Sequence, residues 1–199
     1  MTNWGEIVSA YIILAGLVIG WIRKGSLWTI TNIRLRLLWV LPVAYLLQHF
    51  SIDYMHGVAY EASILLSYIG LVIFGILNMS VPGVLWALMG TVSNFLVMAA
   101  NGLRMPAYMP YVRQMNPQFA VLVQAGKIGK SMAMGSTTHL NFLGDIIPFR
   151  VWPQEMVSVG DILFGIGLAI LIQYGMTLRK GGMPDEKGQA TSSLKPRDS

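Results

Sequence analysis

The most constraining feature of this sequence is a long stretch without charge between Glu61 and Arg104. No Asp, Glu, Lys or Arg stands between these two residues, and the stretch is about twice the roughly 20 residues that one transmembrane helix needs. Asn, Ser, Pro and Gly gather near its middle, at residues 78–83, and such a cluster is typical of a turn. The stretch therefore predicts two membrane-spanning helices joined as a tight hairpin.

Three further apolar runs predict three more helices. The first run is followed directly by Arg23 and Lys24, the reverse of the charge order in a signal peptide, so we interpret it as a retained helix. The second contains Pro42, which a transmembrane helix tolerates. The last follows Ser158 with Asp161 three residues on, the pattern of a capping box. We therefore expect an all-α integral membrane bundle of about five transmembrane helices, over residues 7–22, 37–52, 62–77, 84–100 and 160–178.

Composition supports a membrane protein with a single domain. Charged residues make up 12% of the chain and apolar residues 54%, whereas a soluble domain has roughly a quarter charged and under half apolar residues. The apolar runs leave no room for a separate soluble catalytic domain, so we assign residues 1–180 to one transmembrane domain. Residues 181–199 are rich in Gly, Ser and Lys and predict a disordered cytoplasmic tail. The chain has no cysteine, which excludes disulfides, thiolate metal sites and covalently attached c-type haem.

The positions of the basic residues predict how the bundle is oriented. The net charge of +5 comes from residues at the ends of apolar runs and in the tail, which favours lipid phosphate over nucleic acid as the anionic partner. Four basic residues lie between the first two runs and five more lie between the last run and the carboxyl terminus, and the positive-inside rule puts both groups in the cytoplasm. Four crossings separate the groups, so five helices satisfy the rule. The amino terminus is then outside and the carboxyl terminus inside.

Residues 101–155 form the unusual part of the sequence. This segment is too polar to span a membrane and too rich in large apolar residues to be a solvated loop. Within it, residues 117–135 mix apolar residues with Lys127 and Lys130, which predicts a helix that lies on the membrane or enters the bundle. We expect an extracytoplasmic, partly helical, re-entrant or interfacial segment between helices four and five.

Candidate functional residues gather at the predicted outer end of the bundle. All three histidines, His49, His56 and His139, fall there, together with all six of the acids that lie outside the tail. Imidazole and carboxylate groups ligate metals and perform acid–base chemistry. The spacing of His139 and Asp145 matches no known metal motif, so the sequence predicts no metal site.

Arg104 is the candidate for binding an anion, because a guanidinium pairs with carboxylate or phosphate through two hydrogen bonds. It follows Asn101 and a permissive Gly102 where the fourth helix ends, but an interfacial Arg that reaches lipid phosphate explains it equally well. Asp161 and Asn94 can also be explained by structural roles that involve no ligand. Capping of the last helix explains Asp161, and a helix–helix hydrogen bond explains Asn94; we favour both structural interpretations.

Several of these residues belong to a pattern that resembles a known family. The pattern consists of Asn101-Gly102-x-Arg104-Met105-Pro106, His139, Leu143-Gly144-Asp145 and Ser158-Val159-Gly160-Asp161. It resembles a bacterial family of small membrane proteins known only as a domain of unknown function, in which a second Gly stands at the position of Leu103. The resemblance covers most of the chain and implies a bacterial cytoplasmic membrane location. It marks Arg104, His139, Asp145 and Asp161 as site residues but carries no activity.

The leading functional hypothesis is a protein that binds or transports a small or lipid-linked anionic ligand in an outward-facing polar pocket. Arg104 would meet the anion, and His139 and Asp145 would orient it or relay protons. A second hypothesis is a membrane-embedded hydrolase or transferase of lipid head groups, with His139 as general base. A third is an accessory subunit of a membrane complex that holds haem or quinone through His49 or His139. The cofactor and the oligomeric state stay open at this stage, and an oligomer is compatible with the sequence.

Overall fold

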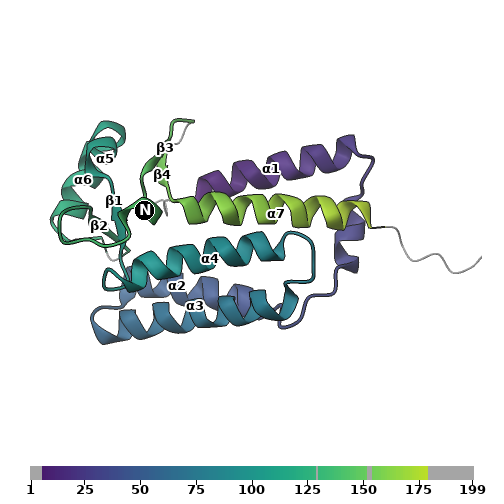
Figure 1. The fold of residues 1–199 in the computed structure, drawn as a ribbon, viewed down its shortest axis with the longest axis horizontal. Helices are drawn as coiled ribbons and strands as arrows, with labels where there is room; N and C mark the ends of the chain where they lie inside the picture. The colour runs from purple at the N-terminus through teal and green to yellow at the C-terminus, as the bar shows by residue number, and fades with distance from the viewer. Residues whose placement is uncertain (1–5, 129, 152–153, 179–199) are drawn as a thin grey trace, which may run out of the picture.

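The computed structural model describes residues 6–128, 130–151 and 154–178. Within these ranges the chain is mostly helical, with five long α-helices close to the places that the sequence predicts (Figure 1). The turn predicted at residues 78–83 joins the third and fourth of them, and Gly83 there adopts a φ of +93° that glycine tolerates best. The long helices are α1 (Glu6–Ile22), α2 (Val40–Tyr54), α3 (Val58–Asn78), α4 (Val84–Ala99) and α7 (Val159–Thr177).

The five long helices pack as a row of neighbours. Helix α1 packs on α7, α7 on α4, α4 on α3, and α3 on α2. Helices α1 and α7 run in the same direction, and α4 runs against them (Figure 1). One end of the bundle carries the segment of residues 105–157, which we name the cap. The opposite end carries the short 3₁₀ helix η1 (Leu27–Asn32), and we name it the η1 end.

Glycines bring α4 and α7 into backbone contact. A Cβ atom added at Gly90 would lie 2.4 Å from the carbonyl oxygen of Gly160. One added at Gly167 would lie 2.4 Å from the amide nitrogen of Ala87. Real Cβ atoms never come this close to backbone, so any larger residue at either position forces the helices apart. Small residues at helix contacts are the usual means of close packing in membrane bundles.

Apolar surface remains on the outside of the bundle. Helices α3 and α7 are each long and apolar enough to cross a membrane, and the stretches Ala10–Ile22, Val40–Ile52 and Val84–Ala99 are apolar but shorter. The core helix of a soluble protein is mostly buried, whereas only 33% of the apolar window of α3 and 28% of that of α7 is buried. These features suggest a membrane location.

The prediction that the chain is all-α was wrong for the cap. The cap has the short helices α5 (Met109–Met115), α6 (Pro117–Gln124) and η2 (Asn141–Leu143), but it also contains two small sheets. Strands β1 (Met105–Ala107) and β2 (Ser131–Ala133) pair in parallel, and β3 (Ile147–Phe149) pairs with β4 (Glu155–Val157) in antiparallel fashion. Strands of three residues are too short to show an alternating pattern in the sequence.

The helix predicted over residues 117–135 is also shorter than expected. The side chain of Asn116 caps the start of α6 by accepting a hydrogen bond from the amide of Phe119. The helix ends at Gln124, and Gly126 then has a φ of +66°, the left-handed conformation that commonly ends helices. The rest of the predicted helix includes β2, which is held by β1 instead.

Two helix starts differ from the prediction. Helix α2 begins at Val40, because Leu37 has a φ of +55°, which an α-helix excludes. Helix α3 begins at Val58, so that the exposed Glu61 lies in its first turn, where an acid interacts favourably with the helix dipole. Helix α2 ends before His56, which therefore shares no helix face with His49. The predicted disordered tail, residues 181–199, lies outside the described residues.

Candidate functional site

Asn101 joins the end of α4 to the cap. Its side-chain amide donates hydrogen bonds to the carbonyl oxygens of Val97, at 2.7 Å, and His139, at 2.8 Å. Its side-chain oxygen accepts a hydrogen bond from the backbone N–H of His139 at 2.8 Å. The backbone of His139 is thus held on both sides by one side chain, while its imidazole is exposed. This contact brings together two of the predicted site residues, which lie far apart in the sequence.

Arg104 leaves the same end of α4 after a tight turn. Gly102 and Leu103 both have positive φ, of +63° and +58°, and the amide of Leu103 donates to the carbonyl oxygen of Met98 at 2.7 Å. A Gly at the position of Leu103 would adopt this conformation with less strain. The Arg104 side chain is partly exposed and lies within electrostatic range of the Tyr60 hydroxyl. In the described ranges its guanidinium has no hydrogen-bonding or ion-pair partner.

Asp145 is held beside β1 by its backbone. Its amide donates to the carbonyl oxygen of Pro106 at 2.9 Å, and its carbonyl oxygen accepts from the amide of Tyr108 at 3.0 Å. Gly144 makes this approach possible, since a Cβ there would lie 2.5 Å from the Pro106 carbonyl oxygen. The Gly-Asp motif is therefore explained by close backbone contact with the strand that follows Arg104.

The Asp145 carboxyl group sits in an environment that favours its neutral form. Burial raises its pKa well above the usual range, and the negative charge of Asp161 raises it further. Lys130 lowers the pKa and Glu155 raises it, both by smaller amounts. The carboxyl group thus lies among groups of both signs, where the cap meets the start of α7.

Asp161 and Asn94 form a closed set of hydrogen bonds with Ser158. One Asp161 oxygen accepts from the Asn94 side chain at 2.8 Å, and the other accepts from the Ser158 amide at 2.9 Å. The Ser158 hydroxyl accepts from the Asp161 amide at 3.0 Å and donates to the Asn94 side-chain oxygen at 2.8 Å. The predicted capping box is therefore confirmed, and Asn94 joins α4 to α7. These bonds are the ones expected if Asp161 caps α7 and Asn94 joins two helices. Ligand binding by Asp161 or Asn94 stays a prediction.

Comparison with known proteins assigns the family. The model of the family of unknown function DUF5317 matches residues 32–173 of the chain. The chain belongs to the DUF5317 family. An uncharacterized protein of Thermotoga maritima is 32% identical over 112 residues, a match that covers 55% of this chain and 62% of that protein. The chain thus spans less than two thirds of this relative. No solved structure matches the chain.

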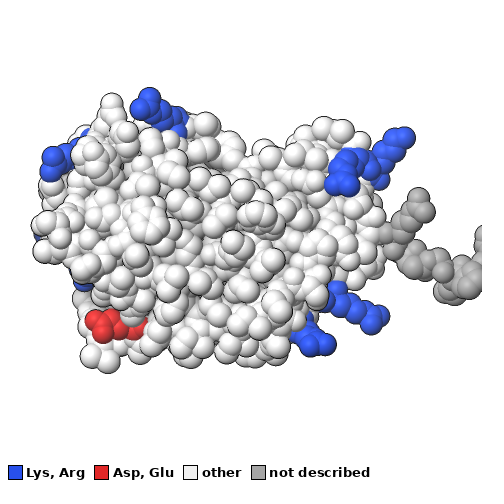
Figure 2. Space-filling model, viewed as in Figure 1, with Lys and Arg blue, Asp and Glu red and all other residues white. Residues whose placement is uncertain are grey.

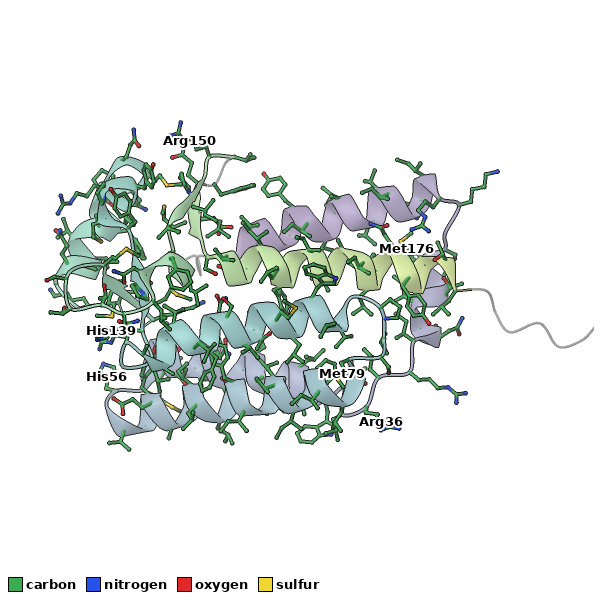
Figure 3. The ribbon with its side chains drawn as sticks, in the orientation of Figure 1. Arg36, His56, Met79, His139, Arg150 and Met176 are labelled. Carbon is green, nitrogen blue, oxygen red and sulfur yellow. The ribbon has the colours of Figure 1, made fainter. Side chains whose placement is uncertain are left out.

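The DUF5317 match includes every predicted site residue, among them His49. His49 lies on α2, where its ring centroid is 6.0 Å from that of Tyr45 and 6.2 Å from that of Phe50. It thus belongs to an aromatic strip of α2. His56 and His139 both lie at the cap end (Figure 3). The described residues contain no group of three or more His, Asp or Glu arranged to hold a metal ion.

Glu155 is a buried polar residue that the sequence reasoning did not single out. It is 1% exposed, and its carboxylate accepts a hydrogen bond from the Val8 amide at 2.5 Å. The first amides of a helix have no partner within the helix, so β4 supplies this one to α1. In the sequence, Glu155 is recognisable only as an acid three residues before the capping Ser158. That position does not indicate a contact with α1.

Proposed function

We propose that the five long helices cross the bacterial cytoplasmic membrane as a bundle. Helix α3, with 21 residues, is about 31 Å long at 1.5 Å per residue, close to the roughly 30 Å of a hydrocarbon core. On the face drawn in Figure 2, charged side chains gather at the two ends and the broad middle has none. A band without charge between charged ends is the surface expected of a membrane protein.

The proposed orientation has the amino terminus and the cap outside and the carboxyl terminus in the cytoplasm. Arg23, Lys24, Arg34 and Arg36 are exposed at the η1 end, where α7 also ends, and this common end supports a single cytoplasmic side. Reporter fusions at the carboxyl terminus and within the cap test the proposal. We expect opposite answers from the two fusions, and the same answer from both would refute the orientation.

We further propose that the outer end of α4, with the adjoining cap, binds the anionic group of a small or lipid-linked ligand. The observation that supports this most is the Asn101 bridge, which holds His139 on the turn that carries Arg104. Within the described residues the Arg104 guanidinium has no protein partner, and the backbone of the exposed His139 is bonded to the same turn, so both side chains can offer hydrogen-bond donors to a carboxylate or phosphate. Binding and transport both fit this arrangement.

Two conservative variants test the anion site with inorganic phosphate and sn-glycerol 3-phosphate as probes. Arg104→Lys keeps the charge but loses the two-pronged donor, so we expect affinity to fall about tenfold. His139→Gln keeps one donor and one acceptor, so we expect a smaller fall, about threefold. Affinity would be measured by calorimetry on the detergent-solubilised chain. Arg113→Lys, on the exposed surface of α5, is the matched control and should bind as the parent does. Equal affinity in all four proteins would refute the site.

A further inference from the structure

The η1 end of the bundle carries a concentrated positive charge. Arg23, Lys24, Arg34 and Arg36 lie within one short stretch of the chain that contains no acid, and all four are exposed. Figure 2 shows basic side chains and no acidic ones at this end of the face that it draws. The cap end carries both signs on the same face. The η1 end is therefore the more strongly attractive of the two for anions.

Helix η1 is fixed to the end of α7. The amide of Ser26 donates to the carbonyl oxygen of Met176 at 2.8 Å. The single hydroxyl hydrogen of Thr29 can be donated to the carbonyl oxygen of Ser26, at 2.6 Å, or to one of two carbonyl oxygens at the end of α7, those of Gly175, at 2.7 Å, and Met176, at 2.9 Å. The latter two are carbonyls of the last turn of α7, which lack partners within the helix. The loop that carries the basic residues thus caps α7, so its backbone pays little ordering entropy when a ligand binds.

Arg36 is fixed separately, to the end of α3. Asn78 is 2% exposed, and its side chain accepts from the Arg36 amide at 2.7 Å and donates to the Arg36 carbonyl oxygen at 3.0 Å. A third hydrogen bond, to the carbonyl oxygen of Phe74 at 2.8 Å, orients the Asn78 amide. Arg36 lies beside the α3–α4 turn that contains Met79 (Figure 3). Its backbone is held while its guanidinium remains exposed.

Exposed tryptophans stand among these basic residues. Trp28, on η1, is 85% exposed, Trp39 is 62% exposed and Trp21 is 54% exposed. Tryptophan is enriched at the boundary between lipid and water, where its ring sits at the level of the head groups. One end of the apolar bundle thus carries both Trp, which suits the boundary of the hydrocarbon core, and Arg, which suits the phosphate groups of the lipid.

We infer that the η1 end binds the phosphate head groups of anionic phospholipids in the leaflet that it faces. Arg34 and Arg36 contact the phosphates, and Trp28 enters the interface beside them. One guanidinium group can bind two phosphate oxygens through two hydrogen bonds. The stretch that contains the four basic residues has no acid to compensate their positive charge. The inference rests on the proposed membrane insertion but not on the anion site at the cap end.

Native mass spectrometry of the full chain in a neutral detergent tests this inference. The chain is titrated with phosphatidylglycerol or with phosphatidylcholine of the same acyl length. We expect phosphatidylglycerol to bind at least about tenfold more tightly, and Arg34→Gln/Arg36→Gln to abolish that preference. Arg113→Gln/Arg150→Gln removes the same charge from exposed positions on the cap and should retain the preference. No preference in the parent, or equal loss in both double variants, would overturn the inference.

Two further measurements separate the alternatives. Inorganic phosphate at millimolar concentration should not displace the lipid, because it lacks the acyl chains beside Trp28, and full displacement would identify free phosphate as the ligand. Raising the salt concentration to about 0.5 M should weaken the preference of the parent chain several-fold, since exposed charges are screened. This second test needs no variant, and a preference that salt leaves unchanged would contradict an electrostatic site. Loss of lipid binding in Arg104→Lys, with binding retained in Arg34→Gln/Arg36→Gln, would assign the lipid to the proposed anion site at the cap end and overturn the inference.

Discussion

Removing the Asn101 side chain should loosen His139 in particular. Asn101→Ala deletes three hydrogen bonds, two to the backbone of His139 and one to the carbonyl oxygen of Val97. A typical hydrogen bond contributes roughly 1 kcal/mol net. That figure is already net of the bonds that water makes in their place, and two of the three bonds hold the backbone of His139. We therefore expect a loss of about 2 kcal/mol in local stability.

Amide hydrogen exchange measures this loss at the affected residue. A local loss of about 2 kcal/mol corresponds to roughly 30-fold faster exchange of the His139 amide. Amides in the middle of α4 should change much less, because their bonds lie within the helix. Asn141→Ala is the matched control, since the Asn141 side-chain oxygen has no partner within the described residues and its amide makes only one contact, at 3.5 Å. A change of less than about threefold in Asn101→Ala, or an equal change in the control, would refute the bridge as a clamp on His139.

Three further predictions follow from the packing and charge of the bundle. Gly90→Val should destabilise the chain by about 3 kcal/mol or more in chemical unfolding, because its Cβ would collide with the backbone of Gly160, whereas Gly135→Ala, with open space around it, should be nearly neutral. The Asp145 pKa is raised in the folded chain, so the contribution of Asp145 to stability should be fully present below the ordinary Asp pKa and be lost as pH rises toward the folded one; Asp145→Asn should lack this contribution in unfolding measured against pH. Ser158→Ala should cost about 1–2 kcal/mol through loss of the α7 cap, measured by the same unfolding assay, and an unchanged midpoint would contradict the capping role.

Much of the helical framework could be predicted because its signals are local. The charge-free stretch and the turn at residues 78–83 predicted α3 and α4, and both are present. The capping box of Ser158 and Asp161 needs only three residues between its partners, so it too could be predicted from spacing. Boundaries were less secure. Leu37 and Gly57 have positive φ, a conformation that the loops around them determine. As a result, α2 and α3 begin at other residues than the sequence predicted.

The cap shows where local reasoning fails. Strands β1 and β2 pair across the intervening helices α5 and α6, and neither strand is long enough to carry its own periodic signal. Parallel strands are joined by a long connection, so no short window of the sequence contains both β1 and β2. The same is true of Glu155, whose partner Val8 lies at the other end of the chain.

The sequence by itself determined which residues of the site are chemically able to act, and the tertiary structure decided which of them meet. Arg104, His139 and Asp145 stand out because guanidinium, imidazole and carboxylate groups are few in so apolar a chain. Only the fold brings His139 to Asn101 and Asp145 to β1, through hydrogen bonds between segments about forty residues apart. A hydrogen bond depends on distance in space, and spacing along the chain sets that distance only within a single helix or turn.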